Sequence, residues 1–129
     1  MNDILVPISP GELLDKITIL RIKAERIQDP TKLANVRLEL QLLERTWRDA
    51  CGKADVATEE RALQAVNERL WDIEDRIRAK EAARAFDAGF IELARSVYIE
   101  NDERAAVKKR INLALGSRLL EEKSYQAYR

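Results

Sequence analysis

Hydrophobic residues recur every three or four positions along most of the chain, with polar residues between them. This period is typical of amphipathic α-helices, whereas the alternation of a β-strand is limited to the short run Ile4–Val6. Glycine and proline fall near the ends of the periodic stretches, at Pro10, Pro30, Gly52 and Gly116. The pattern predicts an all-α fold. The expected helices span about residues 9–28, 30–51, 58–85, 87–100 and 102–115.

Capping residues mark the starts of the first two predicted helices and the end of the second. Ser9 and Glu12, with Pro10 at the first helical position, form a capping box in which hydroxyl and carboxylate each accept a free amide. Asp29, followed by proline, begins the second helix in a similar way. Gly52 is expected to end that helix in the left-handed conformation.

Later boundaries rest on fewer residues. Thr58, followed by two glutamates, is expected to cap the third helix. Asn101 or Asp102 is expected to cap a fifth helix, which Gly116 ends. The sequence therefore predicts a bundle of four to five helices.

The first two helices each carry a narrow apolar seam. The seam positions are Leu13, Ile17, Leu20, Ala24 and Ile27, then Leu33, Val36, Leu40, Leu43, Trp47 and Ala50. Their spacing near 3.5 residues and the tight turn between them predict an N-terminal antiparallel coiled-coil-like helical hairpin. We expect one helical domain over residues 1–129. Because narrow seams suit pairwise contacts better than a wide core, we also expect a second copy to complete the bundle as a homodimer.

Composition narrows the chemistry available to this fold. The 129 residues include 23 basic and 23 acidic side chains, one cysteine and no histidine. Imidazole-based catalysis and histidine-ligated metal sites are therefore excluded, and a single cysteine forms neither an internal disulfide nor a multi-cysteine zinc site. No apolar stretch suits a membrane span or a secretory signal. We expect a soluble, cytoplasmic protein without metal or cofactor, and zero net charge disfavours general nucleic-acid binding.

One acidic row offers chemistry that needs no histidine. Glu68, Asp72 and Asp75 share a face of the third predicted helix, similar to the acidic repeats that hold magnesium in the all-helical nucleotide pyrophosphohydrolases. Those enzymes resemble E-E-x-x-E followed by E-x-x-D, whereas Leu63 and Trp71 occupy the corresponding third positions here. The arginines between the acids favour ordinary ion pairs instead.

Basic residues suggest two further sites. Arg21 and Lys23 resemble the cationic residues of the all-helical chorismate mutases, and Asn101–Arg104 resembles their acid-then-arginine motif, but Ala105 replaces its second carboxylate. The stretch from Arg104 to Leu120 contains basic and no acidic residues, which suits a phosphate-rich partner. It lacks an aromatic residue for base stacking, and its charges also complement a helix dipole.

Several stretches resemble a small bacterial family of uncharacterised all-helical proteins. They are S-P-G-E-L-L-D-K-I-T-I-L from Ser9, L-W-D-I-E-D from Leu70, F-I-E-L-A-R-S-V-Y from Phe90 and E-E-K-S-Y from Glu121. The resemblance covers nearly the whole chain and implies no particular activity. It implies a setting in bacterial surface-polysaccharide or glycosyltransferase systems, and hence an accessory or interaction role.

The candidate ligand-binding set consists of polar residues in these stretches that helix packing alone leaves free. They are Glu12, Asp15, Lys16, Glu74, Arg95, Asn101, Asp102, Arg104, Glu121, Glu122 and Lys123. The structural alternative is that they cap helices and tie the chain end to the bundle.

Two functional hypotheses remain. The first is a non-enzymatic interaction or accessory module, and the alternative is a site for a small anionic ligand such as a phosphorylated compound, a sugar nucleotide or a dicarboxylate. The ligand hypothesis requires several of Lys16, Arg21, Arg95 and Arg104 to converge in a cleft, whereas a module spreads them over its outside.

Overall fold

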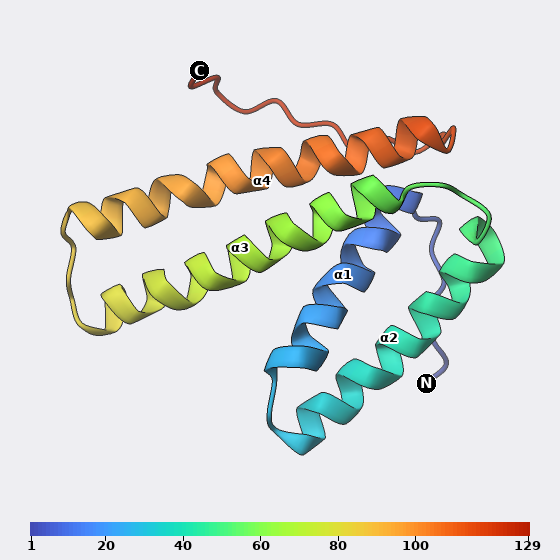
Figure 1. Ribbon diagram of the computed structural model, residues 1–129, viewed down its shortest axis with the longest axis horizontal. Helices are drawn as coiled ribbons and strands as arrows, with labels where there is room; N and C mark the ends of the chain where they lie inside the picture. Colours follow the sequence, from blue (N-terminus) through green and yellow to red (C-terminus); the bar gives the residue numbers. More distant parts are fainter.

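The computed structural model describes residues 1–129 and contains four α-helices. They are α1 (Pro10–Arg26), α2 (Pro30–Cys51), α3 (Ala57–Ala82) and α4 (Ala88–Ala114). Helices α3 and α4 form a long antiparallel hairpin, and the shorter α1–α2 hairpin packs across one end of it (Figure 1). The fold is all-α, as the periodicity predicts.

Two of the predicted helix starts are confirmed in detail. The Ser9 hydroxyl accepts the amide of Glu12 at 3.2 Å, and the Asp29 carboxylate accepts two first-turn amides of α2 at 2.9 and 3.1 Å. The second half of the expected capping box is wrong, because the Glu12 carboxylate does not return to Ser9. It lies 2.6 Å from the ammonium group of Lys108 on α4, where it joins two distant elements.

Tertiary packing sets the boundaries around α3. Thr58 is not the N-cap: α3 begins at Ala57 after Val56, which makes no side-chain capping bond but is buried in the core. Gly52 is not left-handed, since its φ is −60°. The helix ends at Ala82 rather than near residue 85, and Arg84 supplies the left-handed turn with φ 51°.

The expected break between a fourth and a fifth helix is also wrong. Asn101 and Asp102 lie inside α4, which continues without interruption to Ala114. No glycine or proline stands between Gly89 and Gly116, and α3 packs beside α4, so the weak helix propensity of an Asn-Asp pair is overridden. Gly116 follows the helix end with φ 65°, in the expected left-handed conformation.

Helix α1 is the centre of the compact end. It packs against all three other helices, whereas α2 packs against α1 alone among the helices. The main core cluster lies where α1, α3 and α4 meet and comprises Leu14, Val56, Leu63, Val66, Val107 and Ile111. Helix α2 has no buried residue, and its predicted seam is only half-buried where it faces α1.

The opposite end is a projecting two-helix arm. Beyond the Arg26–Asp72 ion pair, α3 and α4 are covered only by each other (Figure 1). Ile73 and Leu93 are buried there, and Phe86 and Phe90 stack edge-to-face with ring centroids 5.2 Å apart. The molecule is thus compact at one end and open at the other.

Candidate functional site

A buried polar network lies where α1 meets α3 and α4. Asp15 is 1% exposed, and its carboxylate accepts hydrogen bonds from Asn67 Nδ2 at 2.9 Å and Arg104 Nε at 2.8 Å. Arg104 pairs with the second carboxylate oxygen as well, which raises the pKa of its guanidinium. Thr18 accepts a further bond from Asn67 at 3.0 Å. Because a buried charge is tolerated only when paired, these partners hold Asp15 in place.

The first turn of α1 touches α4 at a glycine. The amide of Gly11 donates to Asn112 Oδ1 at 2.7 Å, which satisfies a helix-terminal amide that has no partner in its own helix. A Cβ at Gly11 would lie 2.5 Å from the Lys108 carbonyl oxygen and 2.8 Å from Asn112 Oδ1. Only glycine therefore allows this approach, which brings Glu12 beside the ammonium group of Lys108.

Lys108 joins α1 to the C-terminal segment, residues 115–129. Its residue is 8% exposed, and its Nζ lies 2.6 Å from Glu12 Oε2 and 3.0 Å from Glu121 Oε2. Burial acts to lower the pKa of Lys108, but the two carboxylates outweigh it, and the pKa lies above its ordinary value. The same hydrogen bond lowers the pKa of Glu121. Both shifts favour the charged forms of Lys108 and Glu121.

These residues line a small polar cavity of about 270 Å³. Five of its lining residues belong to the candidate set predicted from the sequence: Glu12, Asn101, Arg104, Glu121 and Lys123. Lys108 and Ala105 complete the lining. Every buried side-chain nitrogen and oxygen has a hydrogen-bond partner. A small anion that bound the ammonium group of Lys108 in this cavity would compete with Glu12 and Glu121.

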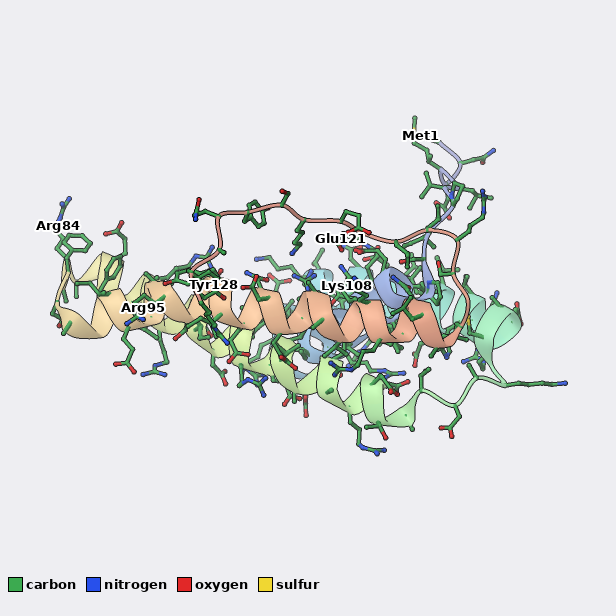
Figure 2. All side chains as sticks on the ribbon, turned by 90° about the horizontal axis from the view of Figure 1, so that it is seen from above. Met1, Arg84, Arg95, Lys108, Glu121 and Tyr128 are labelled. Carbon is green, nitrogen blue, oxygen red and sulfur yellow. The ribbon has the colours of Figure 1, made fainter.

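The other candidate residues lie outside this cavity. Glu122 lines an adjoining cavity of about 200 Å³, and Asp102 lines a larger hollow beneath the C-terminal segment. Lys16 is exposed on α1, and Glu74 pairs with a residue of its own helix at 2.6 Å. Arg95 is exposed on the projecting half of α4, away from Lys108 and Glu121 (Figure 2).

The cations required by the ligand hypothesis do not converge. Arg104 lines the polar cavity, but Lys16 and Arg95 do not. Arg21 binds Glu60 at 2.9 Å and Glu44 at 3.2 Å, tying α1 to α3 and α2. The charged face of α1 therefore forms ion pairs with α2 and α3 through Arg21 and also exposes residues such as Lys16 to solvent.

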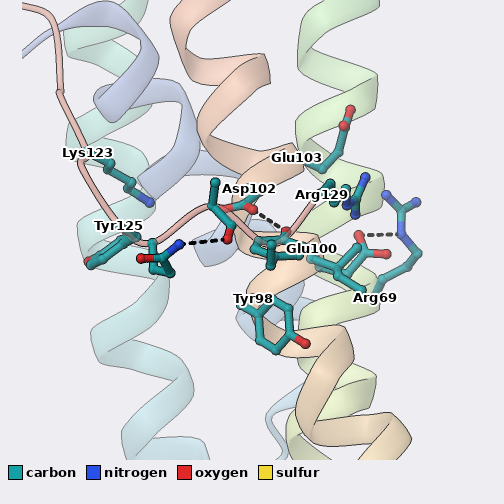
Figure 3. A pocket seen from close by; sticks show the side chains of 12 residues that line it. Arg69, Tyr98, Glu100, Asp102, Glu103, Lys123, Tyr125 and Arg129 are labelled. Atoms are coloured by element: carbon teal, nitrogen blue, oxygen red, sulfur yellow. Dashed lines mark hydrogen bonds and ion pairs between the residues drawn. The ribbon is translucent and has the colours of Figure 1, made fainter.

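The C-terminal segment turns back at Gly116 and runs along α4 (Figures 1 and 2). Besides the Glu121 contact, Tyr128 donates its phenol hydrogen to Asp102, and its ring stacks edge-to-face on Tyr98 with centroids 4.8 Å apart. A hollow of about 1100 Å³ lies beneath the last residues of the segment, Lys123 to Arg129, and is lined by residues of α4 within Tyr98–Glu103 and by Arg69 of α3 (Figure 3).

Sequence reasoning named Asp15 as a candidate but missed the other residues that organise the network. They are Thr18, Asn67, Lys108 and Asn112, all buried. The available signal was local: Thr18 follows the seam residue Ile17 of α1, and Lys108 and Asn112 each follow a core residue of α4. That signal becomes readable only when α1 is known to be enclosed by three helices, because the number of neighbours sets the width of the buried stripe.

Comparison with known proteins places the chain in a family. A family model described as a family of unknown function, DUF6165, matches residues 4–128. The chain belongs to the DUF6165 family. No curated protein and no solved structure matches it. The DUF6165 match includes the whole buried network and the C-terminal segment through Tyr128.

Two general properties complete the description of the site and its surroundings. None of the four helices combines the length and the hydropathy that crossing a lipid bilayer requires. No group of three or more cysteine, aspartate or glutamate side chains is arranged to hold a metal ion.

Proposed function

We propose that this protein is an interaction module that associates with a second copy of itself and acts by binding rather than by catalysis. The observation that carries the proposal is the surface area of the chain. It exposes 9307 Å², whereas a compact monomer of 14.8 kDa exposes roughly 7,000 Å². The excess, roughly 2,300 Å², is larger than the roughly 800 Å² that each partner buries in a standard interface.

The outer face of α2 is the surface proposed for self-association. Leu38 and Leu42 lie one turn apart on α2 and are 59% and 42% exposed. Helix α2 packs against α1 alone, so one side of the α1–α2 hairpin is uncovered. Two such hairpins, placed with their α2 helices together, would form a four-helix arrangement with apolar side chains in its centre.

Sedimentation equilibrium tests this proposal. We expect the wild-type protein to approach twice the 14.8 kDa chain mass at micromolar concentration. The double variant Leu38→Glu/Leu42→Glu should remain a folded monomer, because both side chains are exposed in the single chain. Ile91→Glu, an exposed apolar position on the projecting arm, is the matched control and should still dimerise. A wild-type protein that stays monomeric up to millimolar concentration contradicts the proposal.

The setting of the module is part of the proposal. The resemblance to uncharacterised bacterial proteins supports a bacterial, cytoplasmic accessory role, with surface-polysaccharide biosynthesis as the associated system. Fractionation of cells that express the tagged chain tests this setting. We expect to recover the protein in the cytoplasmic fraction. Recovery with the membrane or the exported fraction would contradict the assignment.

A second candidate function is the binding of a small anion in the polar cavity. The convergence of Arg104, Lys108 and Lys123 on one cavity favours it. Thermal unfolding with phosphate, sugar nucleotides or dicarboxylates tests it, since saturation at about a hundred times the Kd adds roughly 2.7 kcal/mol. The expected upward shift of several degrees should disappear in Lys123→Ala, and no shift across these ligands would reject this candidate.

A further inference from the structure

The C-terminal segment is held to α4 at two points separated by slack chain. Glu121 contacts Lys108, and Tyr128 contacts Asp102 and Tyr98. Lys108 and Asp102 lie about 9 Å apart along the helix axis, whereas the residues from Glu121 to Tyr128 can reach across roughly 23 Å when extended. The segment therefore bows away from α4 between its anchors (Figure 2), and a hollow lies beneath its last residues, around the Tyr128 anchor (Figure 3).

The two anchors are chemically distinct and suit an extended peptide. At one end an ammonium group, supported by Arg104 and Lys123, receives a carboxylate. At the other end the Asp102 carboxylate receives a phenol hydroxyl while Tyr98 packs against its ring. Asp102 follows Tyr98 by four residues on one helix face, so a single helix surface presents this second anchor.

Little else holds the segment in place. Residues 118–129 are all exposed, and no regular secondary structure forms after α4. Docking fixes about a dozen residues, and the lost backbone entropy disfavours the docked form. Only the two anchors offset that loss. A docked and an undocked form of the segment should therefore exchange, leaving the α4 face accessible part of the time.

We propose that this face of α4 is a docking site for an extended segment of a partner protein that carries a carboxylate and, seven residues later, a tyrosine. The chain's own C-terminal segment occupies the site in cis and acts as an internal competitor. This inference goes beyond self-association and uses a surface different from the outer face of α2. A tethered competitor acts at an effective concentration in the millimolar range, so it reduces the apparent affinity for the partner by the fraction of docked chains.

Fluorescence anisotropy with a labelled peptide of residues 116–129 tests the site on the full-length chain. Wild-type protein should bind this peptide weakly, because its own segment competes. The full-length variant Glu121→Ala/Tyr128→Ala, which loses both cis anchors, should bind the wild-type peptide at least about tenfold more tightly. A peptide carrying the same two alanine substitutions should not bind.

Substitutions on this face of α4, made in the Glu121→Ala/Tyr128→Ala chain, locate the binding surface. Adding Asp102→Asn or Lys108→Met should weaken peptide binding about tenfold or more, as expected when one charged hydrogen-bond partner is removed. Asp102 is exposed, so its variant is expected to keep the native circular dichroism spectrum. Lys109→Ala, an exposed neighbouring cation, is the matched control and should leave the Kd unchanged.

The result that overturns the proposal is equally defined. It is overturned if the intact peptide does not bind the Glu121→Ala/Tyr128→Ala chain at millimolar concentration. It is also overturned if neither Asp102→Asn nor Lys108→Met changes the Kd of the peptide. The mass of each variant, measured in parallel by sedimentation, reports self-association separately. A monomeric protein that binds the peptide supports the docking site on α4 and contradicts the proposed dimer. A dimeric protein that does not bind the peptide supports the dimer and contradicts the docking site.

Discussion

At the residue scale, a few buried polar side chains determine how the compact end is assembled. Asp15 connects α1 to both α3 and α4 through Asn67 and Arg104, and Gly11 allows the close contact between α1 and α4. Because buried charges must be paired, each of these contacts specifies one arrangement of the helices and penalises others. The apolar seams alone would permit several arrangements.

Replacing Asp15 by alanine should strongly destabilise the protein. The substitution removes the partner of Arg104 and one acceptor of Asn67, at an expected cost of about 3 kcal/mol in the free energy of unfolding. Asp72→Ala is the matched control, since it breaks the exposed pair with Arg26, and it should leave that free energy almost unchanged. Urea unfolding of both variants checks the difference, and equal destabilisation would contradict it.

Gly11→Ala should destabilise the contact between α1 and α4. The added Cβ meets a backbone carbonyl and a buried amide, and such overpacking costs about 1–3 kcal/mol. Gly89→Ala is the control, because its nearest contact is the flexible end of Lys80 at 3.2 Å. Thermal unfolding should show a lower midpoint for Gly11→Ala only, and a tolerated Gly11→Ala would mean that α1 can shift on α4.

At the element scale, packing rather than capping sets several helix boundaries. Burial of Val56 starts α3 before Thr58, and the neighbouring α3 keeps α4 continuous through Asn101 and Asp102. The turn between α3 and α4 uses Arg84 in a conformation that L-residues adopt at a steric cost. The long contact between α3 and α4 offsets that steric cost.

Arg84→Gly should therefore stabilise the turn. Glycine adopts a positive φ without the Cβ clash, so we expect the free energy of unfolding to rise by up to about 1 kcal/mol. Ala83→Gly, one residue earlier at φ −83°, is the control and should lower it, because glycine gains nothing there and adds backbone entropy to the unfolded chain. Denaturant midpoints measured side by side decide between the two signs.

At the scale of the whole molecule, the structure has a compact end, a projecting arm and a C-terminal segment held at two points. Its surface exceeds that of a compact monomer, and its converging charges are paired within the chain. Both features support binding through extended surfaces.

Docking of the C-terminal segment should depend on pH at both extremes. The pKa of Glu121 is lowered by Lys108, so its contribution is complete above about pH 4.3 and is lost as the pH falls through the lowered value. The pKa values of Lys108 and Tyr128 are raised, so their contributions are complete below about pH 10 and are lost as the pH rises through the raised values. Amide NMR shifts of the segment should report both transitions, and Glu121→Gln should remove the acidic one. An unchanged acidic transition in that variant would contradict the assignment.

The sequence by itself determined the all-α class, the starts of α1 and α2, and part of the residue set that lines the polar cavity. These features depend on local rules: a helical period, a side chain that reaches an amide three residues away, and polar residues that the seams leave unexplained. Only the tertiary structure decided that α4 is continuous, that Glu12 turns to Lys108, and that Asp15 is buried. Each depends on contacts between residues distant in sequence, and burial and pairing at those contacts outweigh local propensities of a few tenths of a kcal/mol to about 1 kcal/mol.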